Sequence, residues 1–87
     1  MARPRKWRRV EFIPTVQHFV PLDMQSDTIE ESILKVEEIE AIRLRDTEDL
    51  EQEQCAERME VSRQTFQRIL GSARKKLADA IINGKAI

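Results

Sequence analysis

The stretch between residues 52 and 70, QEQCAERMEVSRQTFQRIL, limits what this chain can fold into more than any other part. Cys55, Ala56 and Met59 lie three and four residues apart, which places them on one face of a short helix. The helical spacing then breaks at Ser62, a good N-cap because its hydroxyl accepts from the free amides of the next turn. An apolar stripe with helical spacing follows. The pattern therefore predicts a helix-turn-helix.

The second helix of this motif has two unlike faces. Its other face offers arginine, lysine and glutamine, side chains suited to base edges and phosphates. Between Ser62 and Ala78 there are five basic residues and no acid. A merely solvated helix in an ordinary hairpin, the alternative, usually mixes charges of both signs. The apolar stripe consists of Phe66, Ile69, Leu70, Ala73, Leu77, Ala80 and Ile81. The candidate DNA-binding residues are Ser62, Arg63, Gln64, Thr65, Gln67, Arg68, Arg74, Lys75 and Lys76.

A family resemblance rests on ARPRKWRR, on VEEIEAIRLRD, and on EQCAERMEVSRQTFQRIL followed by ARKKLADAIINGKAI. Residues 36–77 resemble the helix-turn-helix of sigma-factor region 4. The whole chain resembles an uncharacterised prokaryotic family of predicted DNA-binding proteins, catalogued as domain of unknown function 134. The resemblance implies a mostly α, three-helix DNA-binding bundle with no known target. Glu60 stands where such motifs usually have glycine, and a left-handed conformation there costs about 1 kcal/mol.

The first nine residues form a second candidate DNA-binding element. They carry no acid and five basic residues, namely Arg3, Arg5, Lys6, Arg8 and Arg9. Pro4 and the repelling charges favour an extended arm. The core ARPRK resembles the GRPRK of minor-groove AT-hooks, with Ala2 in place of glycine, and narrow A·T-rich grooves attract arginine. The alternatives are an arm that binds any polyanion or simply solvates the terminus.

The net charge of −1 does not exclude DNA binding, because the charges are unevenly distributed. Residues 23–54 carry twelve acids against three bases, between the basic arm and the basic last helix. We divide the chain into the arm (1–9), an extended or irregular segment (10–35) and the helix-turn-helix domain (36–87). Prolines in the middle segment exclude a long helix. There we expect extended pieces, including residues 32–34, with Phe12, Val16 and Phe19 facing inward.

A first helix is expected over residues 36–46 and the last over residues 63–82, where Asn83 and Gly84 give a stop signal. Glu37, Glu38 and Glu40 fit a solvated turn at the positive end of the first helix better than a metal or acid–base site. Three further expectations follow. Cys55 packs between helices, His18 is a partly exposed packing residue, and Gly71 permits close approach of another backbone or of DNA.

The sequence contains no Gly-rich phosphate loop, metal-ligand cluster or nucleophile–base pair, so we expect no enzyme and no cofactor. One cysteine, no apolar run of about 20 residues and no secretory signal favour the cytoplasm and no membrane contact. The expected function is sequence-specific binding of double-stranded DNA by a transcriptional regulator that reads the major groove with the helix starting near Ser62. The alternatives are an interaction module of the transcription machinery, in contact with RNA polymerase, and RNA binding through the arm.

We also expect a homodimer, since two half-sites multiply specificity and both ends of the chain carry spare apolar residues. Alternatively, the protein is a monomer, and the N-terminal part of the extended segment (10–35) covers the helical core of the same chain.

Overall fold

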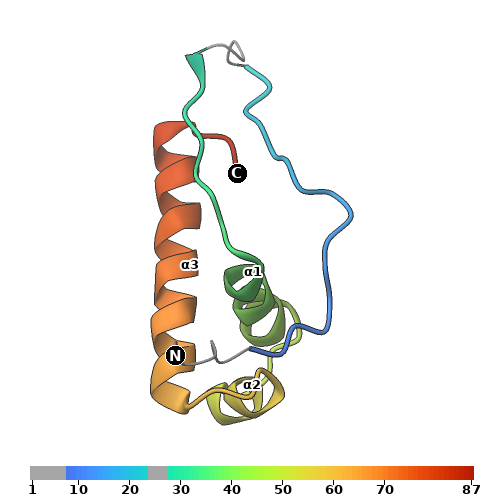
Figure 1. Cartoon of the computed structure of the whole chain (residues 1–87). Helices are drawn as coiled ribbons and strands as arrows, with labels where there is room; N and C mark the ends of the chain where they lie inside the picture. The colour runs from blue at the N-terminus through green and yellow to red at the C-terminus, as the bar shows by residue number, and fades with distance from the viewer. Residues whose placement is uncertain (1–7, 24–27) are drawn as a thin grey trace, which may run out of the picture.

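The computed structural model describes residues 8–23 and 28–87. Its elements are α1 (Val36–Ile42), the π-helical segment η2 (Arg43–Thr47), α2 (Gln52–Arg58) and α3 (Arg63–Asn83). The long helix α3 forms one side of the molecule, and α1 and α2 pack against its N-terminal half (Figure 1). The extended backbone of residues 8–23 lies on the other side of α1, away from α3. The prediction of a small, mostly α bundle of three helices is confirmed.

A small apolar core joins the helices. Its buried members are Ala41, Leu44, Cys55, Ala56, Met59, Phe66, Ile69 and Leu70. They come from α1, η2, α2, the turn and the first half of α3, so every helix buries one face against the others. Cys55 packs here as predicted, and burial raises the pKa of its thiol. The core therefore lies at the α2 end of α3.

The turn between α2 and α3 follows local sequence rules. Glu60 adopts the left-handed conformation with φ of 57°, so the turn keeps the shape that glycine usually allows at this position. The amide of Val61 then donates a hydrogen bond of 3.0 Å to the carbonyl of Ala56. Ser62 is the N-cap of α3, and its Oγ accepts from the amide of Thr65 over 3.1 Å. At the other end Gly84 caps the helix with φ of 64°, which confirms the predicted stop.

The first predicted helix, residues 36–46, is confirmed as α1 followed without a break by η2. The wider π-helical turn ends in a hydrogen bond of 2.8 Å, which the amide of Glu48 donates to the carbonyl of Arg43. Leu44 within it is fully buried. The segment therefore bends the chain toward α2 while it keeps its apolar face on the core.

Backbone hydrogen bonds tie the chain end to two distant segments. Ala86 donates to the carbonyl of Glu30 over 2.8 Å, and Ser32 donates to Ala86 over 2.6 Å. The next residue, Ile87, pairs with Phe19 instead. The Ile87 amide donates a hydrogen bond of 2.8 Å to the Phe19 carbonyl, and the Phe19 amide donates one of 3.1 Å to the Ile87 carbonyl. The expected extended structure near residues 32–34 is confirmed, and it runs alongside the C-terminal half of α3 (Figure 1).

Phe12, Val16 and Phe19 line a hollow on the side of α1 and α3, but the prediction that they cover the helical core is wrong. Their exposed fractions are 50%, 59% and 59%. The three helices already fill their common core, and the segment is held at its two ends by polar contacts near residue 11 and backbone bonds at residue 19. Ile81, predicted to continue the apolar stripe of α3, is 75% exposed because α1 and α2 do not extend that far along α3.

Candidate nucleic-acid interface

The first turns of α3 separate an apolar face from a polar one. Phe66, Ile69 and Leu70 are buried, and the side chains on the opposite side are exposed. We call that side the polar face, and it consists of Arg63, Gln64, Gln67 and Arg68. Among the residues that the structure describes, none forms a hydrogen bond or an ion pair with Gln64 or Arg68. The structure therefore brings these four predicted residues together at the N-terminal end of a 21-residue helix.

The predicted residues Ser62 and Thr65 are occupied in capping. Besides accepting from the Thr65 amide, the Ser62 hydroxyl donates to Oγ1 of Thr65 over 2.9 Å. Such a cap leaves the other free amides of the first helical turn available to an anion. The two residues thus orient the start of α3.

The later basic residues of α3 are arranged differently. Arg74 donates from Nε and Nη2 to the two carboxylate oxygens of Asp46, over 3.1 and 2.5 Å. This guanidinium lowers the pKa of Asp46. Nζ of Lys76 lies 2.7 Å from Oε1 of Glu38. Lys75 is exposed, and no acid of the described part of the chain pairs with it. Of these three cations, only Lys75 makes no hydrogen bond or ion pair within the described part of the chain, although its charge helps to lower the pKa of Asp79, after the larger effects of the hydrogen bonds from Lys85 and Asn83.

The prediction of a solvated acidic turn at residues 37–40 is wrong for two of its three members. Glu38 is 4% exposed and Glu40 is fully buried. Glu38 accepts from Lys76, from Ser72 over 2.7 Å and from the Lys35 amide over 2.8 Å. Burial pushes the pKa of Glu38 up, but these hydrogen bonds outweigh it and the net shift is downward.

Glu40 accepts from Nε of Arg43 over 2.8 Å and from the Glu11 amide over 2.8 Å. Both acids are buried because each has charged or amide donors that replace water. A signal was present in the sequence, since Glu40 lies four residues before Leu44 and so shares its buried face.

The root of the basic arm is fixed to the helices. Nε of Arg8 lies 2.7 Å from a carboxylate oxygen of Glu37, and the Arg9 amide donates over 2.9 Å to the carbonyl of Met59, in the turn before α3. Glu11 accepts from Arg58 over 2.5 Å, and this bond lowers its pKa. The other arm candidates, Arg3, Arg5 and Lys6, lie outside the described residues. The turn before α3 therefore lies directly beside the point where the described chain begins.

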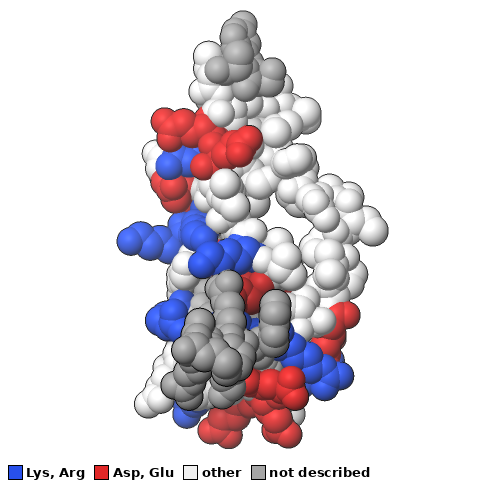
Figure 2. Space-filling view, in the orientation of Figure 1, with Lys and Arg blue, Asp and Glu red and all other residues white. Residues whose placement is uncertain are grey.

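The exposed charges are separated along the molecule. Basic side chains lie along the outer edge of α3, between one group of acidic side chains at the α2 end and a second group toward the opposite end of the molecule (Figure 2). The basic set with exposed positions on α3 is Arg63, Arg68, Arg74 and Lys75, and the acidic set around α2 is Glu51, Glu53, Glu57 and Glu60. The positive field is thus local to α3, although the chain as a whole is slightly negative.

Comparison with known families identifies the chain. A model of the family described as "Protein of unknown function DUF134" matches residues 1–87. The chain belongs to this family. Its relatives include UPF0251 proteins of Clostridium beijerinckii and Clostridium tetani, each 61% identical over 87 residues that cover all of this chain and 59% of the relative. A UPF0251 protein of Clostridium botulinum is also 61% identical, with 55% of its length covered.

The chain therefore spans little more than half the length of these curated relatives. No solved structure matches it. The family descriptions name no ligand, so the chemistry of this member has to be inferred from its own side chains.

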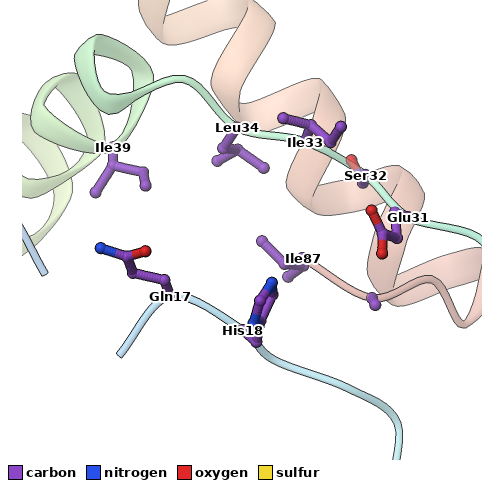
Figure 3. A pocket seen from close by; sticks show the side chains of 9 residues that line it. Gln17, His18, Glu31, Ser32, Ile33, Leu34, Ile39 and Ile87 are labelled. Carbon is purple, nitrogen blue, oxygen red and sulfur yellow. The ribbon is translucent and has the colours of Figure 1, made fainter. Parts of the chain in front are cut away.

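Two hollows in this DUF134 member lie away from the polar face. The larger, of about 730 Å³, separates the N-terminal segment from α1 and α3, and its walls are mainly apolar, with Phe12, Val16 and Ile39 among them. A smaller hollow of about 130 Å³ adjoins it. There Gln17 extends toward Ile39, and His18 extends toward Ile87 (Figure 3). No group of three or more metal-ligating side chains occurs in the described ranges. None of the helices in those ranges has the length and apolar character of a membrane span.

Proposed function

We propose that this protein binds double-stranded DNA sequence-specifically and regulates transcription, with the N-terminal half of α3 in the major groove. The observation that supports the proposal best is the polar face of α3, whose two arginines and two glutamines are exposed directly opposite a buried apolar face. A helix held in this way by a preceding short helix and a tight turn has the architecture of a DNA-reading helix-turn-helix.

The chemistry of the polar face suits base edges. Arginine donates bidentately to the two acceptors of guanine, and glutamine matches the donor and acceptor of adenine. The positive end of the α3 dipole and its free first-turn amides favour nearby phosphates. Exposed Lys75 lies about three turns along the helix, where it would meet the DNA backbone rather than a base. The role proposed here is binding rather than catalysis.

Partly paired cations complete the proposed surface. The Arg74–Asp46 pair is about half exposed, with 51% and 39% of the side chains accessible, so a phosphate can compete with Asp46 for the guanidinium. Lys76 is less available because its ammonium is held by buried Glu38. The arm would contact an adjacent groove from its root beside Met59.

The proposal includes a cytoplasmic homodimer. Large apolar side chains remain exposed on the N-terminal segment and at the end of α3, including Phe12, Ile13, Phe19, Ile81 and Ile82. Exposed apolar surface on this scale is typical of association sites. Light scattering at micromolar concentration should give about twice the chain mass of 10.2 kDa. A single species at the chain mass would reject the dimer.

A selection from randomised duplexes, followed by affinity measurements over a salt series, tests the DNA-binding proposal. Arg63→Ala and Gln64→Ala should relax the selected consensus, since each lost bidentate contact costs about 1–3 kcal/mol of discrimination. Lys75→Ala should weaken all sequences alike and reduce the salt slope by about 1. Absence of duplex binding at low salt, or better competition by structured RNA, would overturn the proposal. A consensus left unchanged by both early substitutions would reject this docking of α3.

A further inference from the structure

Side chains from the first turn of α2 reach across to the polar face of α3. Nε2 of Gln67 donates to Oε1 of Gln52 over 2.8 Å. Gln52 is the first residue of α2, and Gln67 is the fifth of α3. Beside this pair, Nη1 of Arg63 lies 3.6 Å from Oε1 of Glu53. The two helices are thus joined by two polar contacts on the side proposed to face DNA.

The bond to Gln52 determines what Gln67 can still offer a partner. A glutamine amide has two N–H donors and one carbonyl acceptor. The bond uses one N–H, which leaves the other N–H and the carbonyl oxygen. In the major groove adenine presents the N7 acceptor and the N6 amino donor, whereas guanine presents two acceptors. The remaining groups of Gln67 therefore match adenine, and on guanine its carbonyl oxygen would oppose another acceptor.

We propose that Gln52 is a positioning residue that holds Gln67 for the recognition of adenine in one A·T base pair. This inference rests on the proposed function of α3. A glutamine at an exposed position loses rotamer freedom when it binds a base, and a preformed hydrogen bond reduces that loss. The amide N–H groups of Gln52 remain available, and the start of the first helix of such a motif lies near the DNA backbone. Gln52 would thereby link a phosphate contact to a base contact.

Gly71 provides independent support. It lies one turn after Gln67 on the same side of α3, and a Cβ added there would meet no atom within 4 Å. No neighbouring backbone of the described chain explains this glycine in the middle of a long helix. The missing side chain at Gly71 allows a base pair to approach the helix closely. This approach brings adenine within reach of Gln67, whose side chain is shorter than that of arginine.

Three variants of the full chain test this inference in the same duplex selection. Gln67→Ala should abolish the preference for adenine at one position of the consensus, a loss of roughly 5- to 150-fold in discrimination. Gln52→Ala should weaken the preference at that same position only. Gln52→Glu keeps an oxygen that accepts from Gln67, so it should restore the preference while its charge lowers affinity for all sequences alike. Gln17→Ala, in an exposed glutamine of the N-terminal segment, is the matched control.

Unchanged adenine preference in Gln52→Ala overturns the inference while DNA binding by α3 stands. Equal weakening at every position of the consensus also overturns it, because that outcome indicates a structural role. Native-like circular dichroism and melting of each variant exclude unfolding as the cause. If the folded wild-type chain selects no duplex at all, the proposed function fails, and this inference fails with it.

Discussion

The helical part of the molecule and the N-terminal segment (residues 8–23) are held together by different forces. In the helical part Leu44, Met59 and Phe66 are fully buried and make one continuous core. In the N-terminal segment Phe12 and Phe19 are half exposed, and the contacts that hold it are ion pairs and backbone hydrogen bonds. Apolar burial is worth about 25 cal/mol per Å², whereas exposed ion pairs contribute about 0–1 kcal/mol each. The difference implies that the stability resides in the helices and that the segment adds little.

The largest effect should come from emptying the core. Phe66→Ala should lower the free energy of unfolding by about 3–5 kcal/mol, because it removes a fully buried ring. Phe12→Ala, the matched substitution in the N-terminal segment, should cost only about 1–2 kcal/mol, because its ring is half exposed and contacts Arg43 at 5.7 Å from the ring centre. Urea denaturation followed by circular dichroism measures both. Equal losses of unfolding free energy would show that the segment is part of the core and would contradict the conclusion that the helices supply most of the stability.

A smaller effect is expected at the buried carboxylate between α1 and α3. Glu38→Gln should cost about 1–3 kcal/mol, because the groups that donate to Glu38 lose a charged acceptor. The pKa of Glu38 is lowered in the folded state from its ordinary value of 4.5. The charged form therefore stabilises the fold above about pH 4.5, and this contribution is lost as the pH falls through the folded pKa.

The stability difference between wild type and Glu38→Gln should accordingly shrink below pH 4.5 in denaturation curves recorded at several pH values. Glu57→Gln on the exposed side of α2 is the control and should change little at any pH. A difference that stays constant down to pH 3 would contradict an ionised Glu38 in the folded state.

Gly71→Ala should raise stability by up to about 1 kcal/mol, because alanine favours the helix and the added Cβ meets open space. The same variant should bind DNA more weakly if the duplex approaches this position. Thermal melting and duplex affinity, measured on one sample, check the two opposite effects. Higher stability with unchanged affinity would indicate that DNA does not come close to Gly71.

Removal of residues 1–7 should change stability least of all. The truncated chain keeps the contacts of Arg8 and Arg9 with the helices, so its melting temperature should barely move. Loss of Arg3, Arg5 and Lys6 removes three cations, which should reduce the salt slope of DNA binding by up to about 2.7. A large fall in melting temperature would show that the arm is part of the fold. An unchanged salt slope would show that the arm does not contact DNA.

Local chemistry was sufficient to predict the helical framework. The N-cap at Ser62, the left-handed turn at Glu60 and the glycine end at Gly84 each depend on neighbours within a few residues. The buried face of the first half of α3 follows from helical periodicity alone. The exposed positions of the polar face follow from the same periodicity, so the candidate interface was also largely predictable.

Only the tertiary structure decided which charges are paired. Glu38 meets Lys76 across 38 residues of sequence, and Glu11 meets Arg58 across 47. Such pairings depend on how the helices cross and on which donors replace water around a carboxylate, and no short sequence pattern encodes either. The same holds for the bond between Gln52 and Gln67, which forms only because the start of α2 lies against the polar face of α3. Local rules determined where the helices begin and end, and long-range packing determined which of their polar side chains remain available to a partner.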